Sequence, residues 1–412
     1  MIRKIATKNL EIGMFVSDVG RAWFNHPWKT KSRLISERSE VDELLKFGIT
    51  EVYIDTDKSI KKPRPDGPSL KPKMPPVPAR PAPAIRQIKA EEISTPLEEE
   101  FPRAAKAYNK ALDTSKALVA ACRMNKRIEV SEVKENVDAL CESVSRNRDA
   151  LTALIKLRHF DDYTYTHSLN VSVLSISTGK ALGLSDSDLK ILGMGTMFHD
   201  LGKLRIPDQI LNKPGKLTDD EFAVMRSHAT MSAEILTEQN LGVDDQVIQV
   251  ARSHHERIDG SGYPDQLMGG QIPPLATICG LSDVYDALTS DRVYHKGMLP
   301  HDALKFIYGL RGSHFQPDWV DRFIQSVGIY PPGSVVELNT GHLAVIMEVS
   351  NRSLLTPLVK VVADPHGQIY SRTKLVDLSK PAESQGWTIS KVVPPSEAGF
   401  DPAYYFNFKE SV

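Results

Sequence analysis

Seven side chains of the kind that bind transition metals recur along one stretch of this 412-residue chain. They are His167, His199, Asp200, His228, His254, His255 and Asp283. Roughly thirty residues separate one group from the next, which at a rise of 1.5 Å per residue allows a helix, a turn and a second helix in each interval. Facing helices of a bundle commonly build metal centres from inward-pointing side chains. The spacing therefore predicts a mainly α-helical bundle that brings the seven side chains together.

The number and type of these ligands suit two transition-metal ions rather than one. Each adjacent pair, His199–Asp200 and His254–His255, lies about 100° apart on a helix, so one member can serve each ion and Asp200 can bridge both. Imidazole mixed with carboxylate favours iron, manganese or zinc over calcium or magnesium. A single histidine on a helix is usually a core or surface residue, but the joint pattern favours a metal centre. Two ions bridged by water commonly hydrolyse phosphate esters, so the residues indicate a phosphodiesterase.

The motifs around these side chains resemble the HD-GYP domain, a branch of the HD phosphohydrolases that hydrolyses cyclic di-GMP. The matching segments within residues 160–328 are YTYTHSLNV at 163–171, FHDLGK at 198–203, His228, HHERIDGSGYP at 254–264 and DVYDALTSDRVY at 283–294. The resemblance implies two ion sites, one formed by His167, His199, Asp200 and Asp283, and the other by Asp200, His228, His254 and His255. It also implies that Lys203 and Arg292 bind the substrate phosphates.

The chemistry of a phosphodiester agrees with that assignment. Its anionic oxygens repel nucleophiles, whereas two cations neutralise them and lower the pKa of a bridging water towards about 7. Lys203 adds a point charge, and Arg292 adds a planar fork that suits phosphate oxygens. We therefore expect hydrolysis of cyclic di-GMP to pGpG by a hydroxide that bridges two metals, with Asp200 and Lys203 as catalytic residues. Whether the final product is pGpG or GMP stays open.

Two alternatives stay open. The first is a phosphodiesterase for another cyclic dinucleotide, such as cyclic GMP-AMP, or for a different nucleotide phosphate ester. The second is a receptor that binds cyclic di-GMP without cleaving it and signals through protein contacts. The intact set of ligands argues against the receptor.

The chain departs from the family pattern at two positions. Relatives that bind a third ion carry a glutamate four residues before the first histidine, where this chain has Tyr163. We therefore expect two ions. Ala229 stands where many relatives have proline, and we expect little effect because the ligand His228 is kept.

The Gly-Tyr-Pro segment predicts a shaped loop beside the double histidine. Gly260 and Gly262 allow tight turns, and Pro264 restrains the backbone just after Tyr263. We expect the Tyr263 ring to stack on a guanine of the substrate, or the loop to contact a GGDEF or other signalling protein.

Three helix starts can be read from local signals. Thr218 and Glu221 form a capping box ahead of the helix that leads to His228, and Ser185 with Asp188 opens the helix that ends at His199. A third helix begins at the prolines 273–274, which a first turn tolerates, and continues with an apolar stripe that leaves Asp283 on its flank.

The chain is too long for one core, and we expect five parts. Residues 1–58 form a small α+β module with strands at 12–19 and 50–56 and a helix at 36–48. This module resembles one often found ahead of HD-GYP domains, with a ligand-sensing or a docking role.

Residues 59–94 form a proline-rich basic linker. Residues 95–159 form helices that pack on the catalytic bundle or build the seam of a homodimer. Residues 160–328 are catalytic, and 329–412 form a small antiparallel sheet that could pair with the N-terminal module.

From its composition we expect this protein in the cytoplasm. A net charge of −1 gives no pull towards a nucleic acid polymer or an anionic membrane. Cys122, Cys141 and Cys279 form no paired framework, which fits a reducing compartment. No apolar run reaches the length of a membrane span, and the first residues lack the apolar core of a signal peptide.

Overall fold

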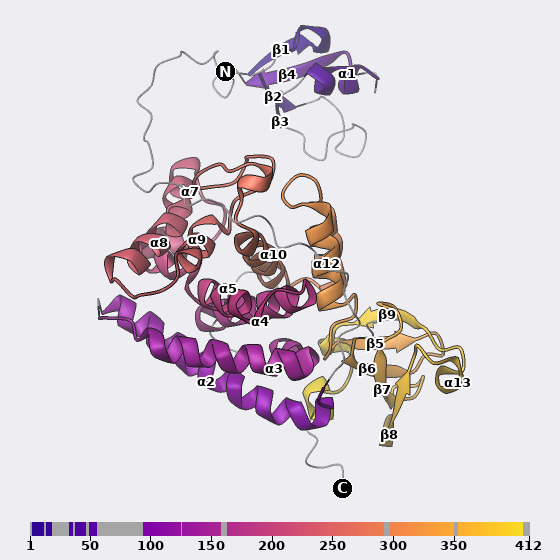
Figure 1. Cartoon of the computed structure of the whole chain (residues 1–412). Coiled ribbons are helices and arrows are strands. Elements are labelled where there is room, and N and C mark those ends of the chain that lie inside the picture. The colour runs from indigo at the N-terminus through magenta and orange to yellow at the C-terminus, as the bar shows by residue number, and fades with distance from the viewer. Residues whose placement is uncertain are drawn as a thin grey trace. The chain divides into compact units, whose positions relative to one another are not determined.

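The computed structural model describes residues 2–11, 14–18, 33–35, 38–46, 49–55, 94–124, 126–157, 163–291, 297–349 and 353–406. The chain divides into two compact units, Met1–Val77 and Pro78–Val412, each with its own hydrophobic core (Figure 1). The architecture is mainly α-helical, with a small α+β module at the N-terminus and a β-rich segment at the C-terminus, as predicted.

The N-terminal unit is a four-stranded antiparallel sheet with one helix. The strands β1 (Ile2–Ala6), β2 (Phe15–Asp18), β3 (Arg33–Leu34) and β4 (Glu51–Asp55) are ordered β1-β4-β2-β3, and α1 spans Arg38–Lys46. Val16, Val41, Leu44 and Val52 are fully buried between the sheet and the helix. The predicted helix and the two predicted strands are confirmed as α1, β2 and β4. Nearly all of the expected linker, residues 59–93, lies outside the described residues, as does Gly48.

Two long helices, α2 (Leu97–Arg123) and α3 (Val130–Leu157), form the connector. They pack along each other, and α3 lies against the bundle helices α4 and α5 (Figure 1). Of the two expectations for this segment, packing on the bundle is therefore the one observed. The helix α3 is interrupted at Asn147, whose φ of −160° and ψ of 102° are not helical. Nδ2 of the Asn147 side chain donates to the carbonyl of Thr95 at 3.1 Å.

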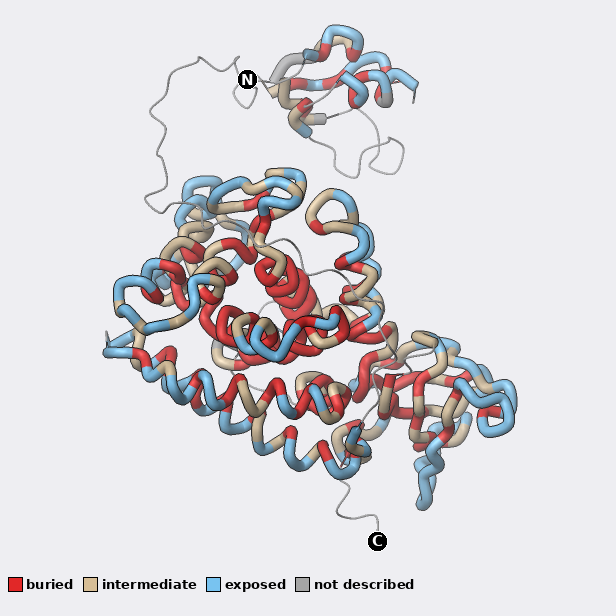
Figure 2. The backbone as a smooth tube through the Cα atoms, viewed as in Figure 1, coloured by how far each residue is buried: buried red, intermediate tan, exposed pale blue. Residues whose placement is uncertain are grey.

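The bundle places α4 and α10 at its centre, where most of their residues are buried (Figure 2). Its elements are α4 (Tyr163–Ala181), α5 (Asp186–Phe198), η2 (Leu201–Arg205), α6 (Asp208–Leu211), α7 (Asp219–Arg226), α8 (His228–Glu238), α9 (Asp245–Ser253), η3 (Gly269–Gln271), α10 (Pro274–Thr289), α11 (Pro300–Tyr308) and α12 (Pro317–Val327). A helix surrounded by protein can be buried on more than one side, so burial in α10 extends beyond the apolar stripe predicted from the sequence.

The three helix starts predicted from the sequence are confirmed. The Ser185 hydroxyl accepts from the Asp188 amide at 3.1 Å. Thr218 and Glu221 form a reciprocal capping box, with distances of 3.3 and 2.7 Å. The prolines at 273–274 open α10. The capping side chains satisfy amides that the first helical turn leaves unpaired, and proline in the first turn has no amide to satisfy. The start of a helix can therefore be read over about four residues.

The C-terminal segment is a five-stranded antiparallel sheet ordered β8-β7-β6-β5-β9. Its elements are β5 (Val335–Leu338), β6 (Leu343–Glu348), β7 (Leu358–Ala363), β8 (Ile369–Asp377), α13 (Pro381–Ser384), β9 (Ile389–Val393), η4 (Pro395–Glu397) and η5 (Pro402–Phe406). The expected pairing with the N-terminal module is wrong, because the described strands form two separate sheets. The C-terminal sheet instead completes a core of its own around Val336, Ile346 and Val359.

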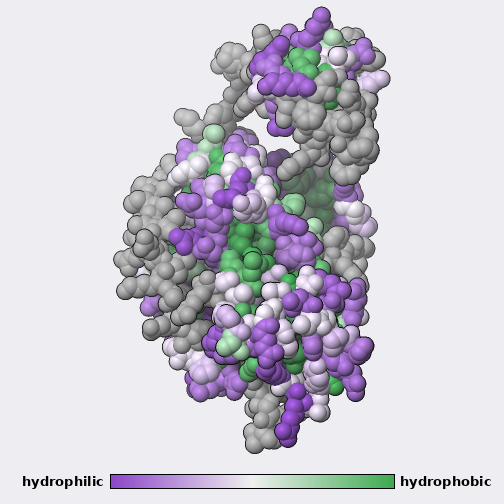
Figure 3. Space-filling model, turned by 90° about the vertical axis from the view of Figure 1, so that its right-hand side faces the viewer, coloured by the Kyte–Doolittle hydropathy of each residue, from purple (hydrophilic) through white to green (hydrophobic). Residues whose placement is uncertain are grey.

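Among the described residues, none of the helices combines the length and the apolar character that a bilayer span requires. On the face shown in Figure 3, hydrophilic residues cover most of the coloured surface, and hydrophobic residues show as several separate areas.

Candidate metal centre

The structure brings all seven predicted side chains together inside the bundle. They come from α4 (His167), the junction of α5 and η2 (His199 and Asp200), the first residue of α8 (His228), the end of α9 (His254 and His255) and α10 (Asp283). All seven are largely or fully buried; the most exposed is His255, whose side chain is 22% exposed.

One half of the cluster is built around His167. The ligand atoms of His167, His199 and Asp200 lie within 4.8 Å of one another. Nε2 of His167 is 3.1 Å from Oδ1 of Asp283 and 3.4 Å from Oδ2 of Asp200. Nε2 of His199 is also 3.4 Å from Oδ2 of Asp200. Two imidazoles and two carboxylates therefore face a common point.

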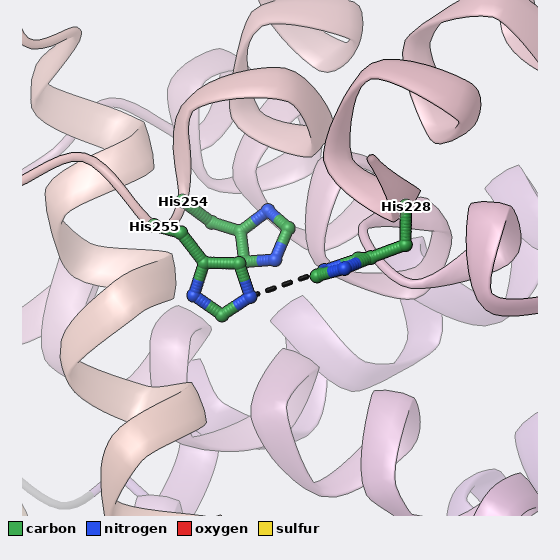
Figure 4. Close-up of side chains that lie close together, drawn as sticks. All are labelled: His228, His254 and His255. Atoms are coloured by element: carbon green, nitrogen blue, oxygen red, sulfur yellow. Dashed lines mark hydrogen bonds between the residues drawn. The ribbon is translucent and has the colours of Figure 1, made fainter. Parts of the chain in front are cut away.

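The other half consists of His228, His254 and His255, whose ligand atoms also lie within 4.8 Å of one another (Figure 4). The Nε2 atoms of His228 and His255 are 3.1 Å apart. Nε2 of His228 is 3.4 Å from Oδ1 of Asp200. Asp200 thus directs one oxygen to each half, which is the arrangement required of a bridging carboxylate.

Three of the histidines are aimed by the ends of helices. Nδ1 of His199, His228 and His254 lies 2.6, 2.7 and 2.9 Å from the carbonyl oxygen three residues earlier in the chain. Each histidine directly follows the last turn of a helix or its cap, where carbonyl groups lack partners within the helix. Donation from Nδ1 to such a carbonyl leaves Nε2 as the lone-pair atom, and this atom points into the cluster.

His167 is oriented by a different relay. Its Nδ1 lies 2.7 Å from Oδ2 of Asp286, and Oδ1 of Asp286 accepts from the Asn170 amide at 3.0 Å. The Tyr108 hydroxyl of α2 donates to Asn170 at 2.7 Å. The sequence analysis missed these three residues. A signal existed for Asp286, which follows Asp283 by one helical turn, but Tyr108 enters from a distant helix.

The donors present fit a divalent transition metal. Nε2 of His199, Nε2 of His254 and Oδ1 of Asp200 are buried and have no hydrogen-bond partner among the described residues. Acceptors buried without partners cost about 1–3 kcal/mol each. Such atoms are rarely left alone in native proteins, so converging lone pairs are best explained by a cation.

The protonation states also suit ligation. Burial lowers the pKa of His199, His228, His254 and His255, that of His255 to about 3, which keeps the imidazoles neutral. Burial acts in the opposite direction on Asp200. The Lys203 ammonium and the other groups around the carboxylate outweigh it, however, so the pKa of Asp200 lies well below its usual value and the carboxylate stays ionised.

Two further predicted residues line the cluster. Nζ of Lys203 lies 2.5 Å from Oδ2 of Asp200, and its side chain is 34% exposed. The Tyr263 ring lies against His255, with centroids 4.7 Å apart and planes inclined by 34°. Arg292 lies outside the described residues, as does the side chain of Tyr163.

Glycines at two motif positions are required by close packing. A Cβ on Gly202 would lie 2.0 Å from the carbonyl oxygen of His228, and one on Gly262 would lie 2.4 Å from the amide of Arg257. The first contact lets η2 approach α8, and the second folds the Gly-Tyr-Pro loop back on the double histidine.

Three family models match the chain. Residues 146–319 match the HD domain, residues 2–133 match a domain of unknown function, DUF3391, and residues 335–398 match a KOW domain associated with HD domains. The order of the matches agrees with the order of the N-terminal module, the bundle and the C-terminal sheet.

The chain is similar to several curated phosphodiesterases. A cyclic di-GMP phosphodiesterase of Pseudomonas aeruginosa is 36% identical over 411 residues, which cover 99% of this chain and 94% of that one. The cyclic di-GMP phosphodiesterase response regulator RpfG of Xanthomonas campestris is 39% identical over 189 residues, 45% of this chain and 49% of that one. The 3'3'-cGAMP-specific phosphodiesterase 2 of Vibrio cholerae is 33% identical over 162 residues, 39% of this chain and 31% of that one. Because the first match runs along nearly the whole of both proteins, the chain belongs to the HD-GYP family of HD-domain phosphohydrolases.

Proposed function

We propose that this protein hydrolyses cyclic di-GMP to pGpG as a metal-dependent phosphodiesterase, with GMP as the alternative final product. The observation that carries the proposal is the position of Asp200 between two groups of imidazoles, with one oxygen towards each group. The relative that matches along nearly the whole chain is named a cyclic di-GMP phosphodiesterase, which supports this choice of substrate.

We assign the ligands to two ion sites that share Asp200. His167, His199, Asp200 and Asp283 would hold one ion, and Asp200, His228, His254 and His255 would hold the other. Mixed imidazole and carboxylate ligands favour iron or manganese, with zinc as the next choice. Tyr163 at the start of α4 supports two ions rather than three. When bound, such cations supply positive charge for the phosphate oxygens and acidify a coordinated water.

The remaining residues act on the substrate. Lys203 is held beside Asp200 and is partly exposed, so its ammonium group can reach a phosphate oxygen at the edge of the cluster. Arg292 follows α10 in the chain by a few residues, and we propose that its guanidinium binds a second phosphate oxygen. Tyr263 forms the wall next to His255 and would stack on a base.

The other parts of the chain serve this domain. We propose residues 160–328 as the catalytic domain and residues 95–159 as its helical connector. We propose residues 1–58, the 59–94 linker and residues 329–412 as regulatory elements around them. The loop residues Asp259 and Ser261 are exposed and offer a surface to a GGDEF or other signalling protein, and we retain homodimer formation as a proposal. The cysteines Cys122, Cys141 and Cys279 are unpaired, which supports a cytoplasmic location.

Metal analysis of anaerobically purified protein, coupled to chromatography of the products, tests the proposal. We expect about two transition-metal ions per chain and release of pGpG from cyclic di-GMP. Protein that contains iron or manganese and binds cyclic di-GMP, yet releases no product, would be a receptor and not an enzyme.

A second substrate has support from the relatives named as cGAMP-specific. Cleavage of 3'3'-cGAMP and of cyclic di-GMP should therefore be compared at equal concentrations. A higher kcat/KM for 3'3'-cGAMP would replace cyclic di-GMP as the preferred substrate.

A further inference from the structure

A wall of two aromatic rings and one cation runs outward from the metal centre. Tyr263 begins the wall against His255. Phe222 and Arg226 of α7 continue it, with the Phe222 and Tyr263 ring centroids 6.4 Å apart. The guanidinium carbon of Arg226 lies 5.1 Å from the Phe222 centroid and 6.0 Å from the Tyr263 centroid.

Arg226 differs from other arginines of the bundle in its partners. Arg252 makes two contacts of 2.7 Å with Asp265, and Arg205 reaches Glu238 at 2.8 Å. Within the part of the chain that the structure describes, Arg226 has neither a carboxylate partner nor an acceptor for its N–H groups. Aromatic rings attract a guanidinium without using up its N–H donors, so the planar fork of Arg226 is available to a ligand.

Phe222 is also unusual for a residue beside a buried cluster, because 47% of it is exposed. Isolated exposed apolar residues are common. Here, however, the exposed ring stands next to an unpaired cation and a second aromatic ring. Flat, apolar faces combined with edge donors suit a purine base better than a phosphate group.

We propose that Arg226, supported by Phe222 and Tyr263, recognises a guanine base of the substrate. Its two terminal N–H groups would donate to O6 and N7, the bidentate contact by which arginine identifies guanine. The inference rests on the proposed function, since a phosphate at the metal centre carries its base one ribose away, on the side of this wall. By this inference, the residues of α7 make the enzyme prefer guanine over other bases of a cyclic dinucleotide.

Equilibrium titration of chelator-treated protein with cyclic di-GMP tests this assignment without turnover. We expect the Arg226→Ala variant to bind cyclic di-GMP about tenfold or more weakly than the wild type. Arg226→Lys keeps the charge but loses the fork, and it should stay weakened. Phe222→Ala should weaken binding of both cyclic di-GMP and cyclic di-AMP, whereas Arg226→Ala should affect only cyclic di-GMP. The control Arg322→Ala removes a guanidinium of α12 that is paired with Gln325, and it should bind like the wild type.

Kinetics of the metal-loaded enzyme separate this inference from the proposed function. Arg226→Ala should raise KM for cyclic di-GMP and leave cleavage of bis(p-nitrophenyl) phosphate, which lacks a base, unchanged. A wild type that cleaves cyclic di-GMP, together with an Arg226→Ala variant that binds it equally well, overturns the inference alone. If Arg226→Ala slows the cleavage of cyclic di-GMP and of bis(p-nitrophenyl) phosphate equally, the inference is also overturned. The substitution would then affect the fold or the metal binding and not the recognition of a base. A wild type that binds cyclic di-GMP without cleaving it defeats the proposed function. The ratio of the affinities of the wild type and of Arg226→Ala for cyclic di-GMP then decides the role of Arg226.

Discussion

Asp286 holds His167 in place: its Oδ2 accepts from Nδ1 of the imidazole at 2.7 Å, deep inside the bundle. This contact directs Nε2 of His167 to the cluster and makes the imidazole a stronger donor. Asp286 reaches no other member of the seven in the described residues, so its effect on metal binding passes through His167.

The variant Asp286→Asn should therefore weaken metal binding without removing a ligand. Loss of such an outer carboxylate typically costs about 10- to 100-fold in metal affinity or activity. Competition with a chelator of known affinity would measure the change. Asp302→Asn, which alters a carboxylate that is half exposed on α11, serves as the control. Equal metal retention in both variants would show that His167 needs no support from Asp286.

Removal of the shared carboxylate should have a larger effect. In Asp200→Ala, both halves of the cluster lose an oxygen ligand, so turnover should be abolished and both ions lost; His199→Ala should also abolish turnover. Elemental analysis and product chromatography would follow the two effects separately. Full activity in Asp200→Ala would contradict the assignment of this residue as a bridge.

Lys203→Ala should separate substrate binding from metal binding. The ammonium group contacts Asp200 and is not itself a ligand, so the metal content should be retained. A hydrogen bond to a charged group contributes about 1.5–3 kcal/mol, and kcat/KM should fall about thirtyfold. Lys305→Ala, at an exposed position of α11, should behave like the wild type. Loss of the ions in Lys203→Ala would assign the lysine to the metal centre.

Gly202→Ala should destabilise the fold. Its Cβ would lie 2.0 Å from the His228 carbonyl and 2.7 Å from the Ser232 amide, and backbone atoms cannot move as a side chain does. We expect a loss of roughly 3 kcal/mol in the free energy of unfolding, measured by denaturant titration. At Gly270 an added Cβ meets nothing within 4 Å, so Gly270→Ala is the matched control. Equal stability of the two variants would rule out close packing of η2 on α8.

Glu348 should make stability depend on pH. Burial, helped by the charge of Asp149, raises its pKa to about 7. Between about pH 4.5 and pH 7, Glu348 is protonated in the folded protein but ionised in the unfolded chain. The free energy of unfolding therefore falls as pH rises through this range. Glu348→Gln should remove this dependence of stability on pH. At pH 8 the variant should be more stable than the wild type by about 2–3 kcal/mol. Unfolding midpoints at pH 5 and pH 8 would test it; the same difference between wild type and variant at both values would contradict the shift.

Local sequence determined most of the helices and all seven members of the cluster. The capping residues Ser185 and Thr218 act on amides three positions away, and the histidines at helix ends use carbonyls three positions back, so four-residue patterns carry that information. The pairing of ligands along the chain sufficed to predict their convergence.

Tertiary packing decided the rest, because the interactions concerned join residues far apart in the chain. At the break in α3 the Asn147 side chain donates to the carbonyl of Thr95, and the hydrogen bonds behind His167 end at Tyr108 in α2. The completion of two separate sheets depends on strand pairing that no local pattern specifies. The sequence by itself therefore determined which side chains form the centre, whereas only the folded structure decided what orients them and which surface surrounds them. Capping acts within one turn of a helix, but buried hydrogen bonds and packing select their partners only in the compact chain.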